Sequence, residues 1–373
     1  MCSNTVPNKA LIAMSGGVDS SLAAKLTKDA GYTCVGCTMK LYRGADAGID
    51  DSPVSGRTCC SLDDTEDARA VAYRLGMPFY VFNFTDDFRN SVILPFASAY
   101  EHGRTPNPCI DCNRYLKFGR LFDRADILHC HTVVTGHYAR IEKKGDSYLL
   151  KKALDETKDQ SYVLYFLDQK QLARLSFPLG EYRKTDVRRL AAEAGFVTAD
   201  KPDSQDICFV PDGDYARVVE LQTGHTPKPG DFVSPEGHVL GHHRGIIHYT
   251  VGQRRGLGIP SGERLYVTRI CPRDNTVTLG TADALFCRDV TVQNFHWIAG
   301  APPAAAFRCT AKLRYRAPDR PADVRVDGDG TVHLHFDDPQ RAVTPGQAAV
   351  LYDGDTVLGG GEIAGSIVYQ SSE

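Results

Sequence analysis

Long apolar runs are missing from this chain of 373 residues. No stretch approaches the ~18 consecutive apolar residues that a membrane-spanning helix needs. The apolar core of a secretory signal is also missing near the N-terminus. These two absences predict a cytoplasmic protein that works without a membrane.

An excess of charge of one sign is missing as well. The formal net charge is −3, with 43 Lys and Arg against 46 Asp and Glu. Such a chain has no overall basic field, so any contact with nucleic acid must come from local patches. One candidate patch contains Arg308, Lys312, Arg314, Arg316 and Arg320. Alternation over 312–316 would put three of these cations on one strand face, and an ordinary solvated face is the alternative.

Cysteine, in contrast, is abundant, with 12 residues. Without a secretory signal, thiols, metal ligands or catalytic residues are expected rather than a disulfide framework. Cys112 and Cys208 lie in polar, turn-rich segments, where a thiolate would be exposed and reactive. The role of Cys59–Cys60 stays open. Six others are expected to be small buried hydrophobic residues, namely Cys34, Cys37, Cys130, Cys271, Cys287 and Cys309.

The most informative stretch is Ser-Gly-Gly-Val-Asp-Ser at 15–20. It stands between an apolar run and an amphipathic pattern, which predicts a strand, a tight turn and a helix. The glycines let the backbone approach an anion, and the helix directs its free N–H groups to the same point. Ser15 and Ser20 can donate to phosphate oxygens, and Asp19 can hold Mg²⁺. The Gly-Lys ending of a Walker A loop is missing.

Strand and helix patterns alternate through the first two hundred residues. Strands are expected at 10–14, 32–39, 79–84 and 132–135, and helices at 21–31, 65–76 and 88–102. This alternation predicts an α/β fold with an N-terminal doubly wound parallel sheet, whose ligands bind at the carboxyl ends of the strands.

The pattern changes after about residue 208. Short strand patterns and Asp-Gly turns then predict a small central domain and a C-terminal β-barrel. The expected strands include 265–267, 276–279, 331–336 and 348–352. We therefore expect domains at 1–210, 211–284 and 285–373.

Several further motifs occur in a fixed order along the chain. They are Gly-Arg-Thr-Pro-Asn-Pro at 103–108, Thr-Gly-His-Tyr at 135–138, Lys-Asp-Gln-Ser-Tyr at 158–162, Asp-Ser at 203–204 with Ile-Cys-Phe at 207–209, Thr-Val-Gly-Gln-Arg-Arg-Gly-Leu-Gly at 250–258 and Val-Thr-Pro-Gly-Gln at 343–347. Together with Ser15–Ser20, they resemble the tRNA-specific 2-thiouridylases over nearly the whole chain. That family belongs to the N-type ATP pyrophosphatases, which have an adenine nucleotide alpha hydrolase-like fold with a PP-loop, and it places sulfur on the wobble uridine of the anticodon loop.

The resemblance implies a role for each matching residue. Cys112 would be the nucleophile and Cys208 the persulfide carrier. ATP, with Mg²⁺, would be bound by Ala13, Met14, Ser15, Gly16, Gly17, Val18, Asp19, Ser20, Met39 and Gly136. The target base would contact Asn107, Pro108 and Cys109, and the rest of the tRNA would contact His137, Lys158, Asp159, Gln160, Arg314, Tyr315 and Gln347. The sulfur would come from a partner protein, either a cysteine desulfurase or a sulfur relay protein.

One departure leaves the sulfur step open. Many members of the family have Asp where this chain has Cys109. Cys208 can therefore carry a persulfide that Cys112 resolves, or all three cysteines can hold a [4Fe-4S] cluster with one open iron.

Two other functions stay open at this stage. An amide-forming ATP pyrophosphatase, similar to NAD or GMP synthetase, shares the PP-loop but has no use for Cys112 and Cys208. A non-catalytic RNA-binding module has no use for the PP-loop.

Overall fold

The computed structural model describes residues 8–44, 62–203 and 207–368. The chain divides into two compact units. The first unit comprises Met1–Ser91, Cys109–Gly213 and Asp355–Val357, and the second comprises Val92–Pro108, Asp214–Gly354 and Leu358–Glu373. Cys59, Cys60 and Ser204 lie outside the described residues.

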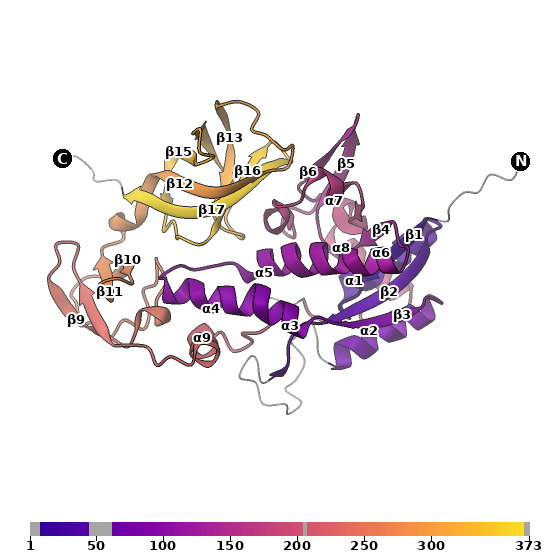
Figure 1. Ribbon diagram of the computed structural model, residues 1–373, viewed down its shortest axis with the longest axis horizontal. Helices are drawn as coiled ribbons and strands as arrows, with labels where there is room; N and C mark the ends of the chain where they lie inside the picture. The colour runs from indigo at the N-terminus through magenta and orange to yellow at the C-terminus, as the bar shows by residue number, and fades with distance from the viewer. Residues whose placement is uncertain (1–7, 45–61, 204–206, 369–373) are drawn as a thin grey trace, which may run out of the picture. The chain divides into compact units, whose positions relative to one another are not determined.

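A five-stranded parallel sheet forms the centre of the first unit (Figure 1). Its order is β3-β2-β1-β4-β7, so the chain proceeds in one direction from β1 to β3 and then in the other direction to β4. The carboxyl ends of β1 and β4 therefore flank the switch point where such sheets bind ligands. The strands are β1 (Lys9–Ala13), β2 (Thr33–Lys40), β3 (Phe79–Asn83), β4 (Thr132–Val134) and β7 (Leu175–Ser176).

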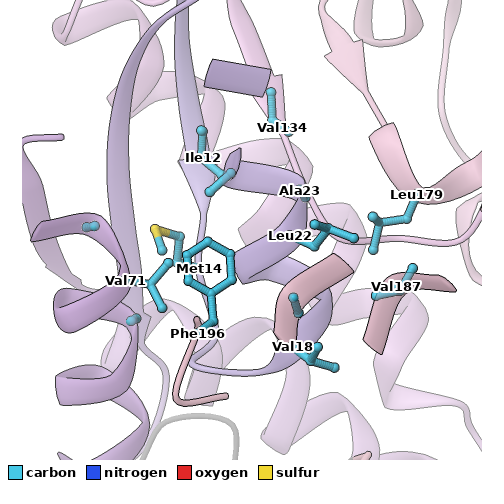
Figure 2. Close-up of a cluster of buried hydrophobic side chains, with 14 of the residues drawn as sticks. Ile12, Met14, Val18, Leu22, Ala23, Val71, Val134, Leu179, Val187 and Phe196 are labelled. Carbon is cyan, nitrogen blue, oxygen red and sulfur yellow. The ribbon is translucent and has the colours of Figure 1, made fainter. Parts of the chain in front are cut away.

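Helices cover both faces of this sheet, which confirms the doubly wound fold. The helices α1 (Val18–Asp29), α2 (Leu62–Arg74) and α8 (Lys184–Glu193) bury one core with Ile12 and Val134 (Figure 2). Side chains alternate along a strand, so the buried Leu11 points to the opposite face. The connection from β3 to β4 crosses the sheet in the opposite direction, so the helices of this connection cover the face to which Leu11 points. One of them, α6 (Leu121–Ile127), contacts β4.

The segment 85–127 departs from the single helix expected at 88–102. It begins earlier, with α3 (Thr85–Phe88), and a π-helical turn at Arg89–Ile93 precedes α4 (Leu94–Glu101). A second helical stretch consists of α5 (Pro108–Asp111) and the π-helix η3 (Cys112–Arg120), which is kinked at Phe118. Such π turns are frequent at functional sites.

Several elements of the first unit had no clear sequence pattern. The strand β5 is largely polar, and the apolar residues of β6 are adjacent in sequence, so neither strand of the hairpin alternates. Thr356 extends this hairpin by pairing with Lys151. These elements are β5 (Arg140–Lys144), β6 (Ser147–Lys151), η4 (Ser161–Leu164), α7 (Gln169–Leu172) and η5 (Pro178–Glu181).

The second unit contains a four-stranded sheet of order β10-β11-β8-β9. Its core includes Phe232, Val267 and Val277, all fully buried. In the same unit α4 packs on α9, where the rings of Tyr100 and Tyr215 stack 4.7 Å apart. The elements are α9 (Tyr215–Thr223), β8 (Gly230–Val233), β9 (Val239–His243), η6 (Ile246–His248), β10 (Tyr266–Cys271), β11 (Thr276–Gly280) and η7 (Asp283–Leu285).

A closed barrel follows in order β12-β15-β14-β13-β16-β17, and pairing of β12 with β17 closes it. Val332, Leu334 and Phe336 alternate into its core, as the sequence predicted. The expected strand over 312–316 is wrong, because β13 ends at Lys312 and a turn follows. The strands are β12 (Phe286–Trp297), β13 (Ala306–Lys312), β14 (Arg320–Val326), β15 (Val332–Arg341), β16 (Ala348–Asp353) and β17 (Thr356–Val368).

Within the described ranges, none of the helices is both long enough and apolar enough to cross a bilayer.

Candidate active site

The segment Ser15–Ser20 forms the turn between β1 and α1 at the switch point of the sheet. The neighbouring strand fixes its start, because Met14 N–H donates to the Cys37 carbonyl at 2.8 Å and the Thr38 hydroxyl donates to the Met14 carbonyl at 2.6 Å. Gly16 has φ +73°, and a methyl group there would lie 2.2 Å from the Asp64 carbonyl oxygen. Only glycine allows this close approach.

Hydroxyl groups hold the turn from inside. The Ser20 hydroxyl accepts from Ser15 N–H and donates to the Gly17 carbonyl, each at 3.1 Å. Ser21 also donates to the Gly17 carbonyl, at 2.9 Å. Gly17 is the N-cap residue of α1 and has no side chain to cap it. The first N–H groups of α1 therefore remain available to an anion, which the helix dipole also favours.

The other residues expected to bind ATP come to the same place. Gly136, two residues beyond β4, approaches α1 so closely that a methyl group there would lie 2.9 Å from the Asp19 carbonyl carbon and from Ser20 N. Met14 and Met39 are buried at the ends of β1 and β2, and Ala13 ends β1. Three adjacent strands thus assemble the set that the sequence analysis assigned to the nucleotide.

Asp19 is surrounded by hydrogen-bond donors. Both of its carboxylate oxygens accept from the Lys184 ammonium at 2.7 Å, and Oδ1 also accepts from the Tyr138 hydroxyl at 2.7 Å. Burial and the Asp19 charge raise the pKa of Tyr138, so the phenol remains protonated and donates. Lys184 is buried and reaches the Asp203 carboxylate as well, at 2.9 Å.

Asp203 is the second carboxylate of this network. It also accepts from Lys158 at 2.8 Å and from Arg188 at 2.9 Å. Burial opposes ionisation, but hydrogen bonds and charge from Lys158 and Lys184 outweigh it and lower the pKa of Asp203 to about 2. Lys158, expected at the tRNA, therefore faces Asp203 in this structure.

Sequence reasoning gave no role to Lys184 or Asp203. Asp203 belongs to the Asp-Ser motif at 203–204, so the sequence drew attention to this residue. The sequence did not indicate which side chains Asp203 contacts. Lys184 lies in the first turn of α8, where the helix dipole disfavours a cation. That position was the single signal available in the sequence.

The Cys208 segment lies beside the carboxyl end of β2. The Tyr42 hydroxyl, two residues past β2, donates to the Cys208 carbonyl at 2.6 Å. Phe209 is buried against Phe88 of α3, with ring centroids 5.7 Å apart. The Cys208 side chain itself is partly exposed. The backbone is anchored while the thiol keeps access to solvent.

Cys109 and Cys112 lie one helical turn apart at the start of α5 and η3, so they share a face. Cys109 is exposed and Cys112 is partly exposed. The helix α3, which holds Phe88 against Phe209, also contacts η3. Within the first unit, α3 therefore contacts the residue that follows Cys208 and, through the Asp87–Arg120 ion pair, the end of η3 distant from Cys112.

The nine described cysteines are all thiols. Cys34, Cys37, Cys130, Cys287 and Cys309 are buried as predicted, and burial raises the pKa of Cys34. The prediction for Cys271 was wrong, because its side chain is partly exposed at the end of β10.

The described residues contain no group of three His, Cys, Asp or Glu side chains arranged to hold a metal ion. Cys109, Cys112 and Cys208, as placed in the described structure, do not form such a group. Mg²⁺ needs one or two protein carboxylates when phosphates supply other ligands. Asp19 is one such carboxylate, but both of its oxygens accept from Lys184 here, so its binding of Mg²⁺ stays a prediction.

Three residues expected at the tRNA are engaged by the protein itself. His137 is buried 2.7 Å from the Thr135 hydroxyl, and burial lowers its pKa well below the usual range, so the ring is neutral. Asp159 is buried and accepts from the Ser161 hydroxyl at 2.8 Å. Gln160 accepts from Tyr138 N–H at 2.9 Å. Their contacts with tRNA stay a prediction.

The remaining expected tRNA residues lie in the second unit, apart from Cys109. Gln347 donates to the Thr105 carbonyl at 2.7 Å, close in sequence to Asn107 and Pro108. Arg314 donates to the Ala342 carbonyl and, at 3.0 Å, to the Thr344 hydroxyl.

The basic patch is weaker than its composition suggested. Arg308 pairs with Asp323 at 3.1 Å and with Asp337. Lys312 lies over the Tyr315 ring, 5.8 Å from its centroid.

A glycine turn with bare helix N–H groups, at the switch point of a parallel sheet, defines a nucleotide-binding α/β domain of the PP-loop class. Comparison with family models agrees with this class. Residues 8–212 match the tRNA methyl transferase HUP domain, 220–281 the tRNA methyl transferase PRC-barrel domain, and 287–363 the aminomethyltransferase beta-barrel domain.

Curated relatives identify the family. The tRNA-specific 2-thiouridylase MnmA 1 of Thermoanaerobacter sp. (strain X514) is 47% identical over 95% of this chain and 98% of its own length. The tRNA-specific 2-thiouridylase MnmA of Chloroflexus aurantiacus (strain ATCC 29366 / DSM 635 / J-10-fl) is 49% identical over 95% and 98%. The chain belongs to the tRNA-specific 2-thiouridylases, an ATP-utilising family, and is a tRNA-uridine 2-sulfurtransferase.

Among solved structures, the U34-tRNA thiolase NcsA from Methanococcus maripaludis with its [4Fe-4S] cluster is 16% identical. The match covers 58% of this chain and 66% of that one, with a TM-score of 0.33. A likeness at this level supports no statement about the ligands of this chain.

Proposed function

We propose that this enzyme thiolates the wobble uridine of tRNA at C2 by activating the C2 oxygen with ATP and then replacing it with persulfide sulfur from Cys208. The observation that carries the proposal is the shared position of two segments. The turn Ser15–Ser20 and the anchored Cys208 backbone both lie at the carboxyl edge of one sheet. Lys184 also joins Asp19 of the turn to Asp203, which precedes the cysteine segment.

In the activation step the C2 oxygen of uridine attacks the α-phosphorus of ATP, and pyrophosphate leaves. The free N–H groups of α1 and the Ser15 hydroxyl would hold the departing phosphates, and the Ser20 hydroxyl would join them by exchanging its bond to the Gly17 carbonyl. Magnesium bound through Asp19 and the phosphates would add charge stabilisation. The product is a C2 oxygen carrying AMP, which is a good leaving group.

In the sulfur step the terminal sulfur of a Cys208 persulfide attacks C2, the C2–O bond breaks and AMP leaves. The Cys112 thiolate then attacks the Cys208 sulfur, and the S–S bond of the persulfide breaks, so its outer sulfur stays on C2 with the electron pair. The resulting Cys112–Cys208 disulfide requires two electrons from an external dithiol. The persulfide itself requires a sulfur-donating protein, either a cysteine desulfurase or a sulfur relay protein.

The base must leave the stack of the anticodon loop before it can react, as single-stranded RNA bases commonly do. Asn107, Pro108 and Cys109 are proposed to contact this base. The proposed contacts to the rest of the tRNA are His137, Lys158, Asp159, Gln160, Arg314, Tyr315 and Gln347. For His137, Lys158, Asp159 and Gln160, contact would require the intramolecular partners described above to be exchanged for RNA.

The test is the identity of the nucleotide products. Incubation with ATP and unmodified tRNA should release AMP and pyrophosphate, with little release when ammonia or glutamine replaces tRNA. Products of ADP and phosphate would contradict the proposal. Stimulation by ammonia would instead favour an amide-forming ATP pyrophosphatase.

Asp19→Ala separates the activation step from folding. The variant should lose tRNA-dependent AMP release, because the loop loses its carboxylate for Mg²⁺. The variant should still fold, because Lys184 keeps Asp203 as a partner. Retention of more than about a tenth of wild-type turnover would argue against a metal role for Asp19.

A further inference from the structure

One quoted motif, at 250–258, has no role in the reaction described above. It opens a loop, here called the arginine loop (residues 250–265), that leads into β10 of the second unit. Three of its glycines, Gly252, Gly256 and Gly258, have positive φ angles of +89°, +76° and +67°. Such angles favour glycine, so the path of the loop is specified by its sequence.

Hydrogen bonds fix the first half of the arginine loop. Gly252 N–H donates to the Val267 carbonyl at 2.7 Å, and Val267 N–H donates to the Gln253 carbonyl at 2.9 Å. The Gln253 side chain accepts from Thr250 N–H at 3.0 Å and donates to the Arg255 carbonyl at 3.1 Å. The backbone at Arg254 and Arg255 is therefore held by hydrogen bonds to β10 and within the loop itself.

The cations of the arginine loop are exposed. Across the described residues, Arg254, Arg255 and Arg264 have no carboxylate within salt-bridge distance, in contrast to Arg308 with its two partners. Arg254 and Arg264 line one hollow of about 280 Å³, where Glu263 is the single carboxylate. A rigid loop with uncompensated guanidinium groups suits phosphate, which arginine binds in a bidentate manner.

The arginine loop also adjoins residues already proposed to contact tRNA. A methyl group at Gly252 would lie 2.9 Å from Ala342 Cβ and 4.0 Å from a guanidinium nitrogen of Arg314. Arg314 in turn bonds Thr344, three residues before Gln347. These contacts all lie within the second unit, so the arginine loop extends the surface of Arg314.

We infer that the arginine loop is a binding site for the sugar–phosphate backbone of tRNA, through Arg254, Arg255 and Arg264. This inference rests on the proposed function, since it takes tRNA as the substrate. Backbone contacts supply affinity and orientation but read no sequence. The site would hold the tRNA body while the cysteines of the first unit act on the base.

The experiment is tRNA binding by fluorescence anisotropy over a series of salt concentrations. Each neutralised phosphate contributes about 0.7–0.9 to the slope of log affinity against log salt. The double variant Arg254→Ala/Arg255→Ala should therefore lower the slope by about 1.4–1.8. Affinity for unrelated tRNAs should fall by the same factor, while ATP affinity should stay at the wild-type value.

Matched variants keep this test specific. Arg273→Ala removes an exposed arginine that lies in the turn between β10 and β11 and pairs with Asp274, and it should leave the slope unchanged. Arg254→Lys/Arg255→Lys keeps the charge and should retain most of the slope. A wild-type slope in the double alanine variant would overturn the assignment of the loop. Absence of tRNA binding by the wild type would overturn the proposed function, and the loop assignment with it.

Discussion

Lys184 connects the two acidic side chains of the candidate site. Its ammonium is the shared partner of Asp19 and Asp203, and the lysine side chain is 10% exposed while the carboxylates are 32% and 22% exposed. Removing the Lys184 ammonium would leave the carboxylates of Asp19 and Asp203 near each other, and each would have one cationic partner fewer. The charges at the site are therefore interdependent, and a substitution of Lys184 should change both the stability of the fold and the affinity for ATP.

Lys184→Met should destabilise the protein by about 1.5–3 kcal/mol, the usual cost of leaving a charged hydrogen-bonding group without its partner. Urea unfolding gives this value from the shift of the midpoint. Lys25→Met removes a lysine from an exposed pair with Asp29, and should cost less than about 1 kcal/mol. Equal costs for the two variants would show that Lys184 is no more than a surface charge.

Asp203 should make the stability depend on pH in the acidic range. Its pKa in the fold is about 2, against an ordinary 3.8, so the ionised form stabilises the fold above about pH 4. This stabilisation is lost as the pH falls from about 4 to about 2. The difference in unfolding free energy between the wild type and Asp203→Asn should narrow over that interval. A difference that stays constant from pH 5 to pH 2 would contradict the role of the Lys158 and Lys184 contacts.

At the scale of elements, the site depends on how closely β4 approaches α1. Gly136 provides this contact, since its position leaves no space for a methyl group beside Asp19 and Ser20. Backbone atoms cannot move aside as a flexible side chain can, so the start of α1 would have to shift. That shift would displace the N–H groups proposed to hold the phosphates of ATP.

Gly136→Ala should therefore weaken ATP binding by about tenfold or more, because an overpacking cost of about 1–3 kcal/mol falls on the loop itself. Equilibrium binding of a non-hydrolysable ATP analogue measures this effect. Gly328→Ala is the control, since a methyl group there meets no atom within 4 Å. Unchanged nucleotide affinity in Gly136→Ala would mean that ATP does not contact the start of α1.

The elements that were predicted correctly are those whose sequence pattern is formed by residues close together in the chain. The turn Ser15–Ser20 is one example, because strand, glycine and helix patterns follow one another within a few residues. The hairpin β5–β6 was not predicted because β5 is largely polar and the apolar residues of β6 are adjacent rather than alternating. The π turns at Arg89–Ile93 and in η3 have no pattern distinct from an α-helix. The role of Lys184 was not predicted because its partner Asp19 is 165 residues away in sequence.

At the scale of the molecule, the sulfur chemistry draws on segments that are distant in the chain. Cys112 begins η3 and Cys208 follows the Asp203 network, and α3 contacts both η3 and the Phe209 ring. The sequence identified both cysteines from their polar surroundings, but not the elements that hold them. Cys109 is exposed on the same helical face as Cys112, and its role depends on which sulfur route operates.

Both sulfur routes require Cys112 and Cys208, so Cys109→Ser is the variant that decides between them. Cys112→Ser and Cys208→Ser should abolish formation of 2-thiouridine, because the persulfide route has no carrier or no resolving thiol without them. On the persulfide route, Cys109→Ser should keep near-normal activity, since Cys109 is neither carrier nor resolving thiol. Protein purified without oxygen should be colourless and free of iron. Loss of activity in Cys109→Ser together with loss of a brown chromophore would establish a cluster on the three thiolates instead.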